Sequence, residues 1–505
     1  MSLIVLATTS LIVFSGTAVF WYLTTSRDYL PGMDPRIPRL RGADKYIGLL
    51  RDLDFNQNLR YGLRNLGDYG SLCVSHLLGM PVVYVGRPEQ AKEVIAVLRE
   101  KPQTLAKTIG TLLGPESILF VPYAEWVPLR KNLGQVFHLR NMKSYFGGFV
   151  DSALDFVARI DGHNARRRRY FEDALARGLS TKPTTLLEPL DVDKCCMDLA
   201  LDVVTRALFS KNLAVQRGNS REFTACLERI TPLFMKTLNP LFWLMHPFQY
   251  REYRRNVGWF HGTIAGWINE RRADPNDNNN NDLLGLMLDA RNPDTNEPLA
   301  PGVILAQCVS FYFAGHDTTA HSMAWALYEI ARHPEVEEKI FEELCDVMGD
   351  RETPTYEEAN RLTYLQWVVK ETLRLHPPGG SFSRYTTEAT EIDRVRIPAG
   401  VMVEISILAI HYSELVWPEP WRFRPERFSD QESEGRHHCA WIPFGLGERN
   451  CIGMNFALAE IRTVLAVLCK KYRLAPSVDM LPHTVSLITI TPVDGIHVHF
   501  IPREQ

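Results

Sequence analysis

Residues 444–453 constrain this chain more than any other segment, because their composition shapes a tight loop around one cysteine. The three glycines of the loop allow tight turns and close approach of the backbone. A helical pattern over residues 455–471 begins directly behind the loop, so its unpaired N–H groups and positive dipole end lie near the sulfur. Both features favour the thiolate form of Cys451. The segment is therefore suited to presenting one sulfur ligand to a metal.

The cysteine pattern narrows the kind of metal centre. Zinc and iron–sulfur sites need three or four converging ligands, whereas this loop offers one, and a single strong axial ligand indicates haem iron. The other eight cysteines form no CxxC pair, and only Cys195 and Cys196 are neighbours. An odd, scattered set of nine cysteines fits a reducing compartment better than a disulfide framework.

The loop resembles the haem-binding signature of the cytochrome P-450 enzymes at every fixed position: Phe444, the Gly-x-Gly, Arg449, Cys451 and the closing glycine. The resemblance implies a mainly α-helical fold with minor β-structure. It also implies a haem b whose iron takes Cys451 as its axial ligand, with Phe444 and Arg449 among the haem-binding residues. The alternative is a structural glycine-rich turn with a buried free cysteine.

A second motif lies inside a helical pattern over residues 301–333, where residues 314–319 read Ala-Gly-His-Asp-Thr-Thr. Threonine is a poor helix former and costly to bury, but its hydroxyl can bond the carbonyl four residues earlier and open the helix beside Gly315. The stretch resembles the family's oxygen-activation motif, which implies that Asp317 and Thr318 deliver the protons that oxygen activation needs. The alternative is a buried threonine satisfied by the backbone and a capped aspartate.

Two further motifs resemble structural parts of the same family. Glu371 and Arg374 match its Glu-x-x-Arg, and Arg427 lies in a Pro-Glu-Arg-Phe segment, so the resemblance implies a three-charge lock that holds the cysteine loop. A haem also has two carboxylates that need cationic or N–H partners.

Four residues match the family's carboxylate partners. Trp126 and Arg130 share one helical face, and Arg449 and Arg384 occupy the other two matching positions. For any one arginine, a solvated or salt-bridged side chain is the alternative.

The N-terminus predicts a membrane anchor. Residues 3–23 carry no charge and can cross roughly 30 Å of hydrocarbon, and positive charge begins at Arg27, which by the positive-inside bias places the N-terminus in the lumen and the body in the cytosol. The alternative, a cleaved signal peptide, lacks a basic start and a clear cleavage site. We expect a transmembrane anchor over residues 1–26, a proline-rich hinge over 27–45 and one haem-thiolate catalytic domain over 46–505, in the endoplasmic reticulum membrane.

Periodicity predicts several local elements. A strand begins at Val82; helices are expected over residues 88–98, 126–139, 142–160, 191–208 and 250–272, and from a capping box at Thr355 to His376. The arginine run 166–169 and the polar stretch 274–282 read as exposed loops, and residues 392–406 as a β-hairpin that turns at Pro398-Ala399-Gly400. A net charge of −3 and a pI near 6.6 argue against nucleic acid as the main partner.

The resemblance implies a monooxygenase that inserts one oxygen atom from O₂ into a lipophilic substrate, such as a fatty acid, sterol or xenobiotic. Electrons would come from NADPH through an NADPH-cytochrome P-450 reductase, with cytochrome b5 as a second candidate partner. The rivals are an isomerase or dehydratase that rearranges a lipid peroxide, which often lacks the acid–alcohol pair, and a non-enzymatic haem binder. The apolar residues 230–248 either enter the bilayer or pack inside the protein.

Overall fold

A computed structural model describes residues 33, 72–77, 80–137, 139–176, 188–236, 240–273, 282–291, 295–477, 482–486 and 489–503. The expected anchor (1–26), the hinge (27–45, apart from Met33) and nearly all of the polar stretch 274–282 lie outside these residues. Within the described part, no helix combines the length and apolar character needed to cross a bilayer.

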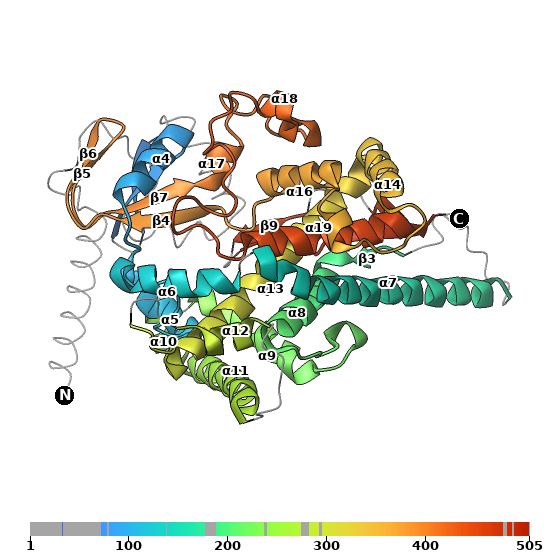
Figure 1. Ribbon diagram of the computed structural model, residues 1–505, viewed down its shortest axis with the longest axis horizontal. Helices are drawn as coiled ribbons and strands as arrows, with labels where there is room; N and C mark the ends of the chain where they lie inside the picture. Colours follow the sequence, from blue (N-terminus) through green and yellow to red (C-terminus); the bar gives the residue numbers. More distant parts are fainter. Residues whose placement is uncertain are drawn as a thin grey trace, which may run out of the picture. The chain divides into compact units, whose positions relative to one another are not determined.

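The chain forms two compact units. The first contains the described residues of Met1–Pro102 with Gly380–Pro418 and His437–Ile442, and the second contains Gln103–Gly379, Glu419–Arg436 and the described residues of Pro443–Gln505. The first holds the four-stranded sheet, and the second is mainly helical (Figure 1). The proposed extent of the catalytic domain, residues 46–505, stays a prediction.

A four-stranded sheet organises the first unit. Its order is β1 (Leu72–Leu77), β2 (Met80–Val85), β7 (Met402–Ser406) and β4 (Ser381–Tyr385). The pairings are antiparallel except for β2 with β7, which are parallel with Val82 opposite Met402. The strand predicted at Val82 is confirmed, and it is completely buried at Val82, Val83 and Val85, as expected for a central strand covered on both faces.

The first unit corrects the predicted hairpin. The strands that pair are β5 (Thr390–Ile392) and β6 (Val395–Ile397), so the hairpin turn lies at Asp393 and Arg394. The chain turns again at Ala399 and Gly400, but the strand that follows, β7, pairs with β2 and β4. Both residues of the hairpin turn have positive φ, 51° and 60°, the geometry of a two-residue hairpin turn that favours glycine or asparagine. Residues from α4 (Pro88–Val97) support the turn: Gln90 Nε2 donates to Asp393 Oδ2 at 2.9 Å.

Helix α13 (Pro301–Arg332) is central to the second unit, packing against α8 (Val192–Phe209), α16 (Thr363–Leu375) and α19 (Met454–Lys471). Its 32 residues span about 48 Å at 1.5 Å per residue. Buried residues surround it on nearly every side, as expected for a helix apolar all round. The predicted helix over residues 301–333 is confirmed.

Helix α7 (Leu139–Ala176) corrects the arginine-run interpretation. The helix predicted over residues 142–160 continues through Gly162 and the run 166–169, which is helical rather than a loop. Arg166, Arg168 and Arg169 are exposed, so the expected solvation is confirmed. Arginine is a good helix former, and one glycine weakens a helix without ending it. Figure 1 shows α7 running beside α19.

The capping box at Thr355 is confirmed, but the helix behind it is split. Thr355 and Glu358 exchange backbone-to-side-chain hydrogen bonds and open only the short α15 (Tyr356–Ala359), and α16 starts anew at Thr363. The other helices of the second unit are α5 (Gln103–Leu113), α6 (Tyr123–Val136), η1 (Val215–Arg217), α9 (Arg221–Lys236), α10 (Pro240–Met245), α11 (Pro247–Ala273), α12 (Leu283–Asp289), α14 (Pro334–Met348), η2 (Pro425–Phe428) and α18 (Asp430–Ser433).

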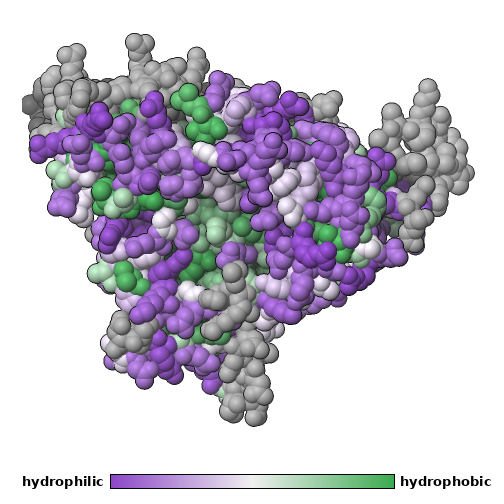
Figure 2. Space-filling view, turned by 45° about the horizontal axis from the view of Figure 1, so that its top comes forward, coloured by the Kyte–Doolittle hydropathy of each residue, from purple (hydrophilic) through white to green (hydrophobic). Residues whose placement is uncertain are grey.

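Small sheets complete the second unit. One joins β3 (Leu190–Asp191), β11 (His497–Pro502) and β8 (Tyr472–Pro476), and the other pairs β9 (Thr484–Ser486) with β10 (Ile490–Pro492). In the first unit, the short α17 (Ile407–His411) follows β7. Hydrophilic side chains cover most of the face drawn in Figure 2, as is usual for the surface of a globular protein.

Candidate active site

The loop at residues 444–453 closes on itself through its own backbone. The N–H of Cys451 donates to the carbonyl of Phe444 at 2.8 Å, and the N–H of Asn450 donates to the carbonyl of Gly447 at 3.1 Å. Gly445 and Gly447 both have positive φ, 71° and 72°, which side chains with a Cβ rarely adopt. Helix α19 starts at Met454, one residue before the predicted start.

The Cys451 thiol lies in a mixed environment. It is accessible to water, yet the protein around it is dense, so burial raises the pKa of the thiol above its ordinary value. The backbone N–H of Gly453 and the charge of Arg130 act in the opposite direction. The predicted support from the helix start is therefore present in the Gly453 N–H, but desolvation outweighs it. A coordinated cation supplies the positive charge that deprotonates a thiol outright.

Three predicted haem-contact residues lie beside this loop. Arg130 Nη2, on α6, donates to Asn450 Oδ1 at 2.8 Å. Arg449 Nη2 donates to the carbonyl of Val121 at 3.1 Å, and its guanidinium lies 4.9 Å from the buried ring of Trp126. Two cations and one indole thus gather at this loop, and the charge of Arg130 acts on the thiol. This set of donors fits a ligand that carries both anionic groups and a metal ion that the cysteine sulfur can coordinate, as a haem does.

Arg384, the fourth predicted carboxylate partner, belongs to the first unit. It lies on β4 and is 3 % exposed. Its Nη1 donates to the carbonyl of Ser383 at 2.9 Å, and its guanidinium lies 5.2 Å from the ring of Phe382.

The middle of α13 departs from the burial of the rest of that helix. Ala314 is exposed although Phe311, Tyr312 and Phe313 before it are buried. Thr318 Oγ1 donates to the carbonyl of Ala314 at 2.7 Å, which confirms the predicted bond to the fourth preceding residue.

Gly315 has a packing role that the sequence did not predict. A Cβ placed there would lie 3.3 Å from Val204 Cγ2 on α8, so this glycine permits close helix packing.

Asp317 is held by residues that the sequence analysis missed. Its Oδ2 accepts a short hydrogen bond from Thr489 Oγ1, just before β10, and its Oδ1 lies 3.7 Å from His321 Nε2. His321 Nδ1 in turn lies 2.7 Å from Asp193 Oδ1 on α8. The only sequence signal was the spacing of Asp317 and His321, four residues apart on one helix face. Thr489 and Asp193 are remote in sequence, so their approach was not predictable from local patterns.

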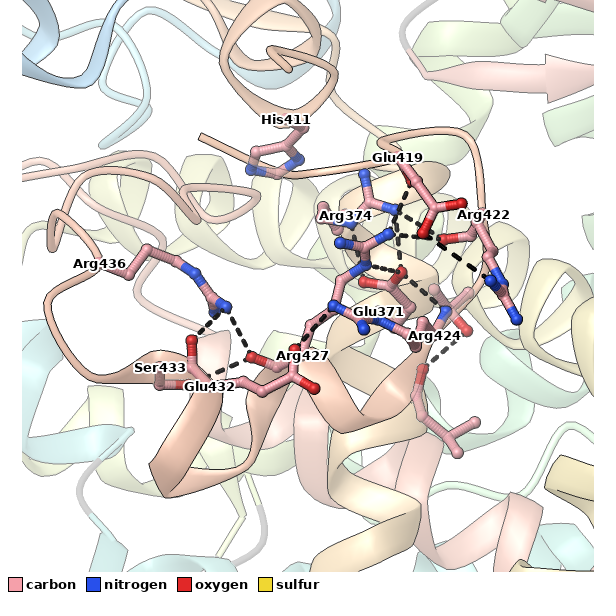
Figure 3. Close-up of polar contacts among 12 residues, drawn as sticks. Glu371, Arg374, His411, Glu419, Arg422, Arg424, Arg427, Glu432, Ser433 and Arg436 are labelled. Carbon is pink, nitrogen blue, oxygen red and sulfur yellow. Dashed lines mark hydrogen bonds and ion pairs between the residues drawn. The ribbon is translucent and has the colours of Figure 1, made fainter. Parts of the chain in front are cut away.

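The predicted three-charge lock is assembled as expected (Figure 3). Arg374 makes two bonds to the Glu371 carboxylate, at 2.8 and 2.9 Å, and Arg427 Nε donates to the same carboxylate at 3.2 Å. All three side chains are at most 1 % exposed. The N–H of Arg424 also donates to Glu371, at 3.0 Å.

Backbone carbonyls accept further guanidinium protons of the lock. Arg427 Nη2 donates to the carbonyl of Glu419 at 2.7 Å, and Arg374 Nη2 lies 3.4 Å from the carbonyl of Arg422. Burial lowers the pKa of Arg427, against the charge of Glu371. One carboxylate thus compensates two buried cations, and carbonyl dipoles stabilise the excess charge.

One other group among the described residues could hold a metal ion: His437, His438 and Cys439, which follow one another in the first unit. His437 Nδ1 already accepts the N–H of Cys439 at 3.1 Å. Cys439 is completely buried, and burial raises the pKa of its thiol to about 11. Both facts make this group a poor thiolate donor.

Comparison with known proteins places the chain in a family. The family model described as Cytochrome P450 matches residues 47–497, so the chain belongs to the cytochrome P450 family of monooxygenases. Membership implies a haem with a cysteine thiolate ligand. The mainly helical fold with minor strands is confirmed.

Individual relatives span different shares of the chain. Cytochrome P450 4F12 of Homo sapiens is 29% identical over 418 residues, covering 79% of this chain and 76% of that protein. The 11-oxo-beta-amyrin 30-oxidase of Glycyrrhiza uralensis is 27% identical over 474 residues, covering 89% and 84%. Cytochrome P450 3A31 of Mesocricetus auratus is 36% identical over 239 residues, which cover 46% of this chain and only 48% of that protein.

The fold is also that of a solved structure. The crystal structure of cytochrome P450DA heme domain matches with a TM-score of 0.81 at 23% identity, covering 93% of this chain and 98% of that one.

Proposed function

We propose that this protein is a membrane-anchored haem-thiolate monooxygenase that inserts one atom of O₂ into a lipophilic substrate, with Cys451 as the iron ligand. The observation that carries the proposal is the loop at residues 444–453, where backbone bonds present one water-accessible thiol beside Gly453 N–H and the Arg130 cation. Cys439 is the weaker candidate because it is completely buried and its His437 neighbour is already engaged.

The residues around Cys451 have separable roles in this proposal. Trp126, Arg130 and Arg449, with Arg384, would bind the two haem carboxylates, and Phe444 would anchor the loop against the ring. A bound haem supplies the redox chemistry that activates O₂. The Glu371, Arg374 and Arg427 lock holds the chain before the loop and takes no part in the chemistry.

Electrons would come from NADPH through an NADPH-cytochrome P-450 reductase, with cytochrome b5 as a second donor. The test is reconstitution of the full chain with haem and that reductase, followed by NADPH-dependent O₂ consumption. A peroxide isomerase or a haem binder would consume neither NADPH nor O₂. Spectral titration with fatty acids, sterols and drug-like hydrophobes would then identify the substrate class; one relative is named as an oxidase of 11-oxo-beta-amyrin.

Thr318→Ala will uncouple the reaction. Its hydroxyl lies beside the exposed Ala314, where the proposal has it position protons at the oxygen site, so its loss will leave NADPH consumption in place but divert it to hydrogen peroxide. Asp317→Asn will instead slow turnover, because a well-placed proton donor is worth about 10²–10⁴-fold. Product, peroxide and NADPH are measured together on one identified substrate.

Thr319→Ala is the control for these two variants, because it removes a neighbouring hydroxyl of the same helix that is buried on another side. It is expected to keep the wild-type ratio of product to peroxide. Unchanged coupling and rate in both Thr318→Ala and Asp317→Asn would make these residues structural and would favour the isomerase alternative.

The membrane proposal has support from α10 and the start of α11. Leu244, Met245 and Phe248 are 78%, 67% and 86% exposed, and exposed basic residues follow at 251, 254 and 255. Such an apolar patch with adjoining positive charge is typical of a segment that enters the interface of a bilayer. Other parts of residues 230–248 pack inside instead: Ile230 and Phe234 are buried.

Deleting residues 2–26 will release most of the protein from endoplasmic reticulum membranes but leave some attachment through this patch. Adding Leu244→Ser, Met245→Ser and Phe248→Ser will remove most of the rest, because burying each such side chain contributes roughly 1.5–3 kcal/mol. The measurement is fractionation with high salt and carbonate. Leu415→Ser, at a position 85% exposed in the first unit, is the matched control. Complete solubility of the truncated chain in low salt would refute the second contact.

A further inference from the structure

A continuous chain of polar contacts leads from α8 to Asp317, and every member belongs to the second unit. His321 Nδ1 lies 2.7 Å from Asp193 Oδ1, and His321 Nε2 lies 3.2 Å from Thr491 Oγ1. Thr491 Oγ1 lies 3.3 Å from Thr489 Oγ1, whose hydroxyl donates to Asp317 Oδ2. Three side chains, one imidazole and two hydroxyls, thus connect the carboxylates of Asp193 and Asp317.

The donor and acceptor roles in this chain follow from its ends. A carboxylate only accepts, so His321 Nδ1 carries a proton that it donates to Asp193. At the other end Thr489 donates to Asp317, which leaves the Thr489 oxygen free to accept from Thr491, and Thr491 free to accept from His321 Nε2. When His321 is protonated on both nitrogens, its Nδ1–H points to Asp193, and the hydrogen bonds from Nε2 onward can all run toward Asp317. The Thr491 hydroxyl has a second acceptor, the carbonyl of Thr489 at 3.4 Å.

The electrostatics favour a protonated His321. Its side chain is only 3% exposed, and burial by itself lowers its pKa. The hydrogen bond to Asp193 and the charges of Asp317 and Asp193 outweigh burial, so its pKa is raised above the ordinary value near 6.5. His316, the other imidazole on this part of α13, has its pKa lowered by burial and remains neutral. His321 therefore carries a proton at neutral pH more readily than a free histidine.

We propose that His321, Thr491 and Thr489 form a proton relay that supplies Asp317. One proton leaves Nε2 of the His321 imidazolium for Thr491 Oγ1, the Thr491 hydroxyl proton passes to Thr489 Oγ1, and the Thr489 proton passes to Asp317 Oδ2. The net result is a neutral imidazole and a protonated Asp317, and no bond other than O–H and N–H changes. The transfer leaves His321 with its Nδ1 proton, still donated to Asp193, and with an unprotonated Nε2, which is the site that must regain a proton before the next transfer.

This inference rests on the proposed function, because it assigns a source to the protons that Asp317 would pass to the oxygen site. In it, His321 is a positioning and proton-holding residue remote from the substrate. The matched variants are Thr491→Val, which removes one hydroxyl at nearly constant shape, and Thr491→Ser, which keeps it. Thr463→Val is the control, since the buried Thr463 hydroxyl bonds only the carbonyl of Ala459 in its own helix.

The first measurement needs no turnover. Histidine ring resonances of the full chain are titrated by NMR, and His321 is assigned by their loss in His321→Asn. We expect His321 to titrate above pH 6.5 and its pKa to fall in Asp317→Asn, which removes a facing negative charge. A His321 pKa that is unchanged in Asp317→Asn would overturn the relay, because the two groups would then have no electrostatic interaction.

The second measurement follows product per NADPH in the reconstituted enzyme. Thr491→Val should lower product per NADPH several-fold. The loss is smaller than the factor of about 10²–10⁴ for a directly placed proton donor, because water can partly replace one hydroxyl. Thr491→Ser should recover most of that loss. In the wild type, product per NADPH should fall as pH rises through the His321 pKa. In His321→Asn, product per NADPH should be low and should not change over that pH range.

Two results separate the relay from the function on which it rests. If the wild type consumes no O₂ with NADPH and reductase, the proposed function is wrong and the relay is wrong with it. If the wild type is active and Thr491→Val matches both it and Thr463→Val, the relay alone is wrong.

Discussion

Cys451→Ser will abolish the red-shifted Soret band of the reduced carbon monoxide complex and all turnover. Serine cannot replace the ligand because its alkoxide does not form near neutral pH and its hydroxyl is a weak donor to iron. The loop itself should survive, since its closure depends on backbone bonds at residues 444, 447, 450 and 451 rather than on the sulfur. The measurement is the carbon monoxide difference spectrum of the reduced protein, with circular dichroism to check the fold.

Cys439→Ala is the discriminating control for this experiment, because Cys439 is the other cysteine among the described residues that lies in a potential metal group. It is expected to keep the Soret band, since its thiol is completely buried and its pKa is raised to about 11. If Cys439→Ala lost the band and Cys451→Ser kept it, the ligand assignment would be reversed.

Glu371→Gln will destabilise the second unit by about 3–5 kcal/mol, the usual cost of removing one partner from a buried ion pair. The cost is large because Arg374 and Arg427 would both stay buried without a compensating charge. Glutamine can still accept one hydrogen bond, so geometry is partly kept while charge is lost. The measurement is the urea midpoint of the holoprotein together with the fraction of chain that retains haem.

Glu357→Gln is the matched control for the buried carboxylate. Glu357 pairs with Lys143 at 2.7 Å, but both side chains are more than 60% exposed, and exposed pairs contribute little to stability. Its urea midpoint should equal that of the wild type. Equal midpoints for Glu371→Gln and Glu357→Gln would show that the lock does not stabilise the fold.

Local chemistry made much of the fold predictable. The uninterrupted apolar character of α13, the Thr355 capping box and the positive-φ glycines behind Phe444 each specify a structure within a few residues of sequence. The hairpin prediction failed because it relied on the same local signals. Residues 398–400 carry proline and glycine, but the actual turn at Asp393 and Arg394 has neither.

The turn at Asp393 depends on tertiary contacts instead. Gln90 donates to its side chain, and its N–H donates to Glu93 at 2.7 Å, both about 300 positions earlier in the chain. The surroundings of Asp317 were missed for the same reason. The motif at residues 314–319 identified the acid and the alcohol, but His321 gains meaning only through Asp193 on α8 and Thr491 on β10. Sequence patterns locate such residues singly, and the fold brings them together.

The parallel pairing of β2 with β7 also affects how the chain is made. Val82 pairs with Met402, which is synthesised 320 positions later. At about 5–20 residues per second on the ribosome, this delay is roughly a quarter of a minute to a minute. During this time the edge of β2 that faces β7 has no strand to pair with, and unpaired edges are templates for association between nascent chains. Yield in a cell should therefore depend on chaperones that occupy this edge until β7 emerges.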